Sequence, residues 1–155
     1  MNPEKEPLSI SISTLVKDGK RLIEFYKPED HFHVVIKNNS DSSIKLWTEK
    51  SSWGFYNLSF EIITPNGEKF IARKKEREWD KNFPDYCSVE PFAYFLLNVN
   101  FNDGTWQYPP MHLATSGNVI TLSAIFEVPP TKESKELNIW NGKISSRENE
   151  YVIWY

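Results

Sequence analysis

Apolar and polar residues alternate with a period of two in many short segments of this chain. The clearest case is Tyr56, Leu58, Phe60 and Ile62, which single polar residues separate. Because successive side chains on a strand point to opposite faces, this period indicates a strand with one buried face. Further strands are expected at 8–12, 22–26, 32–36, 44–47, 69–73, 95–101, 120–128 and 151–155.

Turn-forming sequences separate these segments, for example Asp18-Gly19 and Pro65-Asn66-Gly67. Helical character is confined to one short helical turn near 131–137, with Thr131 as its N-cap. Many short strands between turns predict an all-β fold: an immunoglobulin-like sandwich of two antiparallel sheets with eight or nine strands. A small barrel is the alternative.

The length of 155 residues suits one domain, so we expect a polar N-terminal arm over 1–7 and a single sandwich over 8–155. The hydrophobic fraction of 39% is low, but 15% of the residues are aromatic. Each buried aromatic side chain removes roughly 150–250 Å² from water, which compensates for the shortage of aliphatic residues. A single cysteine, Cys87, excludes an internal disulfide framework.

The formal net charge of −3 argues against nucleic acid or an anionic membrane as the partner. A basic cluster at 73–77 is interrupted by Glu76 and is expected to be solvated. No run of 18 apolar residues occurs, so no transmembrane segment is expected. The polar start predicts a soluble, cytoplasmic protein as the chain stands, or an exported one if an N-terminal signal has been removed.

Three segments carry a resemblance to known domains: FHVVIKNNS (32–40), WGFYNLSFE (53–61) and LSAIFEV (122–128). They look like strands of bacterial immunoglobulin-like or fibronectin-like accessory domains, in which such a strand runs into an Asn-x-Ser turn. The chain is also distantly similar to domains of the intracellular-proteinase-inhibitor type. Those usually carry a Pro-Gly-Glu turn, whereas this chain has Glu90-Pro91-Phe92-Ala93. The resemblance implies a β-sandwich accessory module and assigns no functional residue.

Candidate catalytic residues are few. His31 and His33 share one face of a strand and would suit a metal, but no carboxylate follows at a suitable distance and His112 lies in a loop. Cys87 has no flanking nucleophile signature, so a half-buried structural cysteine is expected. Glu61 and Glu127 occupy the polar phase of strands, where side chains normally face water. No enzymatic activity, metal or cofactor is therefore predicted.

The aromatic residues outside the alternating segments are the best candidates for binding. Trp53, Trp79 and Trp106 fall in expected turns or loops, with Tyr108 close by. Loops at the ends of a sandwich form binding surfaces, and exposed Trp and Tyr are common interface anchors that also stack on sugar rings. The competing interpretation is that these side chains fold back and cap the core.

These features favour a non-catalytic binding or accessory module whose partner is another protein. The alternative is a carbohydrate-binding module that uses the loop tryptophans, and a metal-dependent enzyme based on His31 and His33 is a remote third. Protein binding predicts an apolar patch or an exposed strand edge, and sugar binding predicts a flat row of exposed tryptophans. An enzyme needs a pocket with convergent ionisable groups.

Overall fold

The computed structural model describes residues 6–24, 27, 29–109 and 118–154. Four sequence predictions fall partly or wholly outside the described residues: positions 1–5 of the N-terminal arm, the end of the strand expected at 22–26, His112, and the last residue of the strand expected at 151–155.

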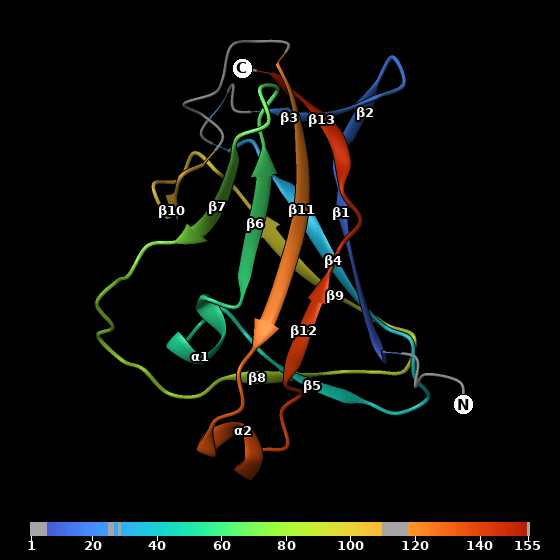
Figure 1. The fold of residues 1–155 in the computed structure, drawn as a ribbon. Helices are drawn as coiled ribbons and strands as arrows, with labels where there is room; N and C mark the ends of the chain where they lie inside the picture. The colour runs from blue at the N-terminus through green and yellow to red at the C-terminus, as the bar shows by residue number, and fades with distance from the viewer. Residues whose placement is uncertain (1–5, 25–26, 28, 110–117, 155) are drawn as a thin grey trace.

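The fold is mostly β, as the alternation predicts, with two short helices (Figure 1). No helix among the described residues is long and apolar enough to cross a membrane. The elements are β1 (Leu8–Ser13), β2 (Leu15–Lys17), β3 (Lys20–Glu24), β4 (Phe32–Asn38), β5 (Ile44–Trp47), α1 (Ser52–Phe55), β6 (Leu58–Ile63), β7 (Lys69–Lys74), β8 (Tyr86–Val89), β9 (Tyr94–Val99), β10 (Trp106–Gln107), β11 (Val119–Val128), α2 (Lys132–Glu136), β12 (Gly142–Ser145) and β13 (Asn149–Trp154).

The strands form three hydrogen-bonded sheets in place of the two that were expected. The main sheet has eight strands in the order β10-β7-β6-β11-β13-β3-β2, with β12 also paired to β11. A three-stranded sheet has the order β1-β4-β9, and β5 pairs with β8. The main sheet is mixed, because β13 runs parallel to β3. These two strands come from opposite ends of the chain, so no hairpin turn constrains them to be antiparallel.

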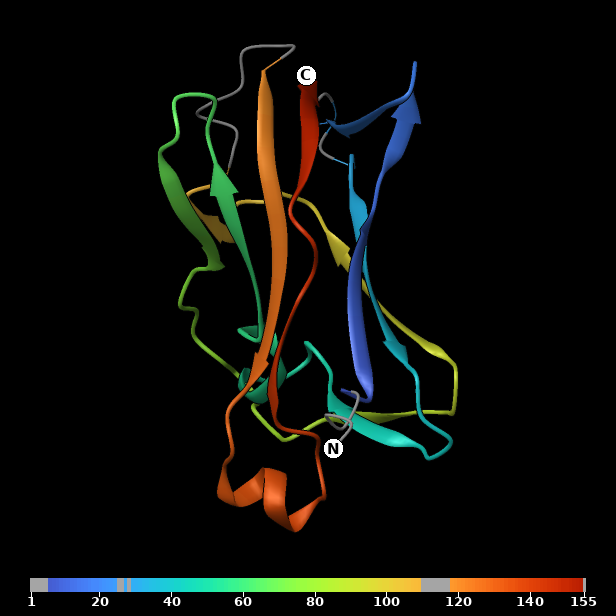
Figure 2. The ribbon, with the colours of Figure 1, turned by 45° about the vertical axis from the view of Figure 1, so that its right-hand side comes forward.

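The core lies where the three-stranded sheet faces the main sheet (Figure 2). The rings of Phe32 on β4 and Phe60 on β6 are 5.8 Å apart across this space. The predicted strand phase is confirmed, because each residue expected to face inward is at most 4% exposed. These residues are Leu58, Phe60, Leu97, Val99, Leu122 and Phe126.

The two helices differ in how well they are capped. The expected helical turn is present as α2, and Thr131 caps it through a reciprocal pair of hydrogen bonds with Ser134. Sequence periodicity did not predict α1, which has four residues and places Trp53 in a helix rather than a loop. Gly54 is required there, because a β-carbon at this position would lie 1.8 Å from the carbonyl oxygen of Thr48.

Candidate functional site

Trp106 is part of the hydrophobic core. It lies on β10, which pairs with β7, and its side chain is only 3% exposed. Its ring lies 5.4 Å from the rings of both Phe60 and Phe101. The expectation of a loop at this position is wrong, because a two-residue strand adds to the sheet edge and directs the indole inward.

The other two loop tryptophans are half-buried. Trp53 packs against Trp47, with 6.3 Å between the ring centroids. The pKa of Glu133 is lowered by a hydrogen bond with its own backbone and, second, by one from the side chain of Trp53. The contact with Trp47 connects α1 to the buried end of β5.

Trp79 lies edge-on to Phe55, with 5.3 Å between the ring centroids. The guanidinium group of Arg77 covers its ring at 4.2 Å. Tyr108, by contrast, is 62% exposed. The four aromatic candidates therefore do not form a flat, exposed row, and only Tyr108 has most of its surface in solvent.

The basic cluster at 73–77 is not fully solvated, which corrects the expectation from sequence. The Lys74 side chain is 6% exposed, and its ammonium group pairs with the Glu49 carboxylate. The same ammonium lies 4.3 Å from the ring centroid of Phe55 and 5.7 Å from that of Trp106. Arg73 remains exposed, as expected.

The two histidines considered as metal ligands lie beside each other at the start of β4. His31 and His33 stack edge-on at 5.3 Å, and His31 Nδ1 contacts the carbonyl oxygen of Glu29 at 2.8 Å. In the described part of the chain, no group of three His, Cys, Asp or Glu side chains is placed to hold a metal. Burial, and then the charge of Asp85, raise the pKa of the half-buried Cys87 thiol. That shift disfavours the reactive thiolate.

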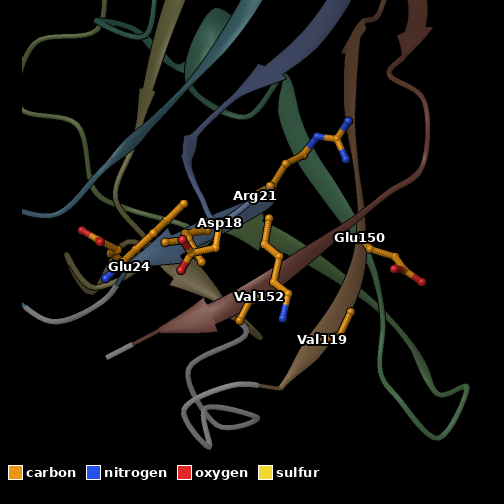
Figure 3. A pocket seen from close by; sticks show the side chains of 10 residues that line it. Asp18, Arg21, Glu24, Val119, Glu150 and Val152 are labelled. Atoms are coloured by element: carbon orange, nitrogen blue, oxygen red, sulfur yellow. The ribbon is translucent and has the colours of Figure 1, made fainter.

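A pocket of about 490 Å³ lies between the β2–β3 hairpin and β13 (Figure 3). Its charged lining residues include Arg21, Glu24 and Glu150. In the close-up view the charged ends of these three side chains are spread apart rather than directed at one point. Lys17, Asp18 and Lys20 also line this pocket.

The outer edge of β9 is the most distinctive exposed feature of the three-stranded sheet. Among the described residues β9 pairs with β4 alone, so its other edge is open. Tyr94 is 61% and Leu96 is 59% exposed, and both side chains lie on the outer face. The strand contains no charged residue and no proline, the features that usually protect an open edge from pairing.

The backbone groups of β9 that point to this edge have no partner strand among the described residues. The Ala93 carbonyl accepts a bond of 3.0 Å from the Asn38 N–H on β4. Because bonding alternates along an antiparallel ladder, Phe95, Leu97 and Val99 direct their N–H and C=O groups to β4. Tyr94, Leu96 and Asn98 direct theirs to the open edge. We call these three residues the β9 edge. The sequence did not predict it, because alternation does not show which strands lie at the border of a sheet.

Comparison with protein-family models finds no match for this chain, and comparison with curated proteins finds no significant similarity.

Proposed function

We propose that this chain is a non-catalytic protein-binding domain that pairs an extended segment of a partner protein with the β9 edge. The supporting observation is that Tyr94, Leu96 and Asn98 each combine two features. Their backbone N–H and C=O groups point to the open edge, and their side chains are exposed. In strand addition the main chain supplies affinity, while alternate side chains supply specificity. The β9 edge offers both on the same residues.

The chemistry of the outer face defines the partner segment. Val35, on β4 beside Leu96, makes this face apolar. Lys37 lies beside Tyr94, its Nζ 5.5 Å from the ring centroid, and it has no ion pair among the described residues. The occupant is therefore an extended segment with apolar residues at alternate positions and an acidic residue at the end that adjoins Tyr94.

We also propose that the domain is a variant of the immunoglobulin-like sandwich suggested by the sequence resemblance. Support comes from the shared core between the three-stranded sheet and β6 and β11, including the contact between Phe32 and Phe60. The variant departs from that fold through the parallel pairing of β13 with β3. An accessory role fits an open edge better than a catalytic one, since the charged ends of Arg21, Glu24 and Glu150 are spread apart in the pocket between the β2–β3 hairpin and β13.

The β9 edge is tested with extended peptides that carry valine or tyrosine at alternate positions and glutamate at one end. Binding should slow hydrogen exchange at the amides of Tyr94, Leu96 and Asn98, measured by NMR. Leu96→Pro removes an N–H from the open edge without removing a bond to β4, so binding should weaken at least about tenfold. Leu96→Thr keeps this N–H and should bind more tightly than the proline variant.

Two results would contradict the proposal. One is peptide binding that does not involve the β9 edge: the three amides stay unprotected, or Leu96→Pro does not weaken the binding. The other is protection that rises with protein concentration without peptide, which would identify a second copy of this chain as the occupant. Circular dichroism of the Leu96→Pro variant controls for loss of folding.

A further inference from the structure

A second pocket, of about 430 Å³, lies on the outer face of the main sheet beside α1. We call it the α1 pocket. Its volume falls in the range of small-molecule sites. The lining residues that carry the argument are Trp53, Tyr56, Asn57, Ser59, Arg73 and Glu127. The β9 edge belongs to the other sheet, so the two sites are structurally independent.

Asn57 provides the strongest indication of a ligand. The residue is 6% exposed, yet its side-chain Nδ2 has no hydrogen-bond partner. An unpaired buried amide destabilises a fold, and so it calls for an explanation. The Nδ2 atom is closed to solvent in this structure, so a ligand oxygen in the α1 pocket, which Asn57 lines, would accept the missing hydrogen bond once the side chain turns toward it.

Strand pairing brings charged groups to the same face as Asn57. The Glu127 N–H donates to the Asn57 carbonyl at 3.0 Å, and Arg73 lies opposite Ser59 in the β6–β7 register. Directly opposed residues share a face of a sheet, so all four side chains lie on the outer side. Neither Arg73 nor Glu127 forms an ion pair among the described residues. The pocket thus offers free donors and a free acceptor with no net charge.

Aromatic rings complete the pocket. Trp53 packs against Trp47, with 6.3 Å between the ring centroids, so a contact with the core supports its indole. The Tyr56 hydroxyl oxygen accepts a hydrogen bond of 3.2 Å from the backbone N–H of Arg77 in the following loop. Rigid aromatic walls lower the entropy lost on binding.

We propose that the α1 pocket binds a neutral saccharide ring. A sugar hydroxyl both donates and accepts hydrogen bonds, so it can accept from Asn57 and Arg73 and donate to Glu127. The apolar face of the same ring can pack on Trp53 or Tyr56. A charged ligand would leave Arg73 or Glu127 beside a like charge.

The test measures binding to the full chain by saturation-transfer NMR and tryptophan fluorescence. The probes are glucose, galactose, mannose, N-acetylglucosamine and their β-linked and α-linked disaccharides, with glycine as a zwitterionic comparison. At least one saccharide should bind with a dissociation constant of about 1 mM or tighter. Glu127→Gln and Arg73→Gln should each weaken that binding about tenfold, since each removes a charge-assisted hydrogen bond.

Controls separate this site from the rest of the molecule. Glu68→Gln removes an exposed carboxylate from the β6–β7 turn, outside the pocket, and should not change saccharide affinity. Leu96→Pro at the β9 edge should also leave it unchanged, so failure of the protein-binding proposal would not affect this result. The inference is overturned if no saccharide binds, if only glycine binds, or if the Glu127 and Arg73 variants bind as well as the wild type.

Discussion

At the scale of single residues, the environment of Lys74 links the core to the aromatic residues around α1. Its ammonium group is enclosed by the rings of Phe55 and Trp106 and neutralised by Glu49. A buried charge is tolerated only when it is paired, because its desolvation costs several kcal/mol. The side chain of Glu49 is 31% exposed, so the carboxylate could be solvated alone, whereas the ammonium could not.

This asymmetry predicts unequal effects of removing the two partners. Glu49→Gln leaves the buried ammonium unpaired and should lower the free energy of unfolding by about 3 kcal/mol. Lys74→Met removes the charge that needs a partner and should cost less. Glu61→Gln is the matched control, since its partner Lys69 is exposed, and it should cost at most about 1 kcal/mol. Urea unfolding measures all three, and equal losses for Glu49→Gln and Glu61→Gln would contradict the burial of Lys74.

Alternation identifies core residues well and identifies buried charge poorly. Phe60 and Leu122 were placed correctly because the side-chain period of a strand is fixed by its backbone. Lys74 was missed because its burial depends on rings from α1 and β10, which are distant in sequence. The pocket residue Asn57 was also placed on the polar phase, and only the packing of α1 shows that it is buried and unpaired.

At the scale of elements, α1 and α2 provide a natural comparison of helix capping. Thr131 accepts a hydrogen bond from the Ser134 N–H, whereas Ser51 occupies the same N-cap position of α1 without a side-chain bond. The Ser51 hydroxyl is buried and has no hydrogen-bond partner in the described part of the chain. A cap stabilises a helix only through the backbone donor that it satisfies.

Thr131→Ala should therefore destabilise the protein by about 1 kcal/mol, the usual cost of losing a helix cap. Ser51→Ala should be neutral or slightly stabilising, because it removes a buried hydroxyl that lacks a partner. Thermal unfolding followed by circular dichroism compares the two variants directly. A greater loss for Ser51→Ala than for Thr131→Ala would mean that the Ser51 hydroxyl has a partner in solution.

Element length explains only part of which secondary structure was predictable, since the four-residue β5 was expected as well. β6 and β11 contain enough residues to show a period, and both were expected. The missed strands β2, β8, β10 and β12 have two to four residues each, too few to define an alternation. α1 was missed for the same reason, although Ser51 and Ser52 before Trp53 are a weak N-cap signal.

At the scale of the whole molecule, β11 organises the main sheet. Its ten residues pair with β6 on one side and with β13 and β12 on the other. Strand order of this kind is not visible in a sequence, because pairing between distant segments depends on the complete set of buried faces. The parallel contact between β13 and β3 is the clearest example, since nothing local to either strand specifies it.

The position of a strand in the main sheet should determine the stability of its backbone hydrogen bonds. The amides of Leu122, Ala124 and Phe126 lie on the central strand, and these residues are at most 1% exposed. They should exchange with solvent only through global unfolding, whereas β2, a three-residue edge strand with every residue exposed, should exchange through local opening.

Native-state hydrogen exchange by NMR at increasing urea concentration distinguishes these routes. The free energy of exchange of the β11 amides should fall with urea as steeply as the free energy of global unfolding does. That of the β2 amides should hardly change. If β2 exchanged as slowly as β11, its edge would have to be covered in solution, and the main sheet would extend beyond the strands described.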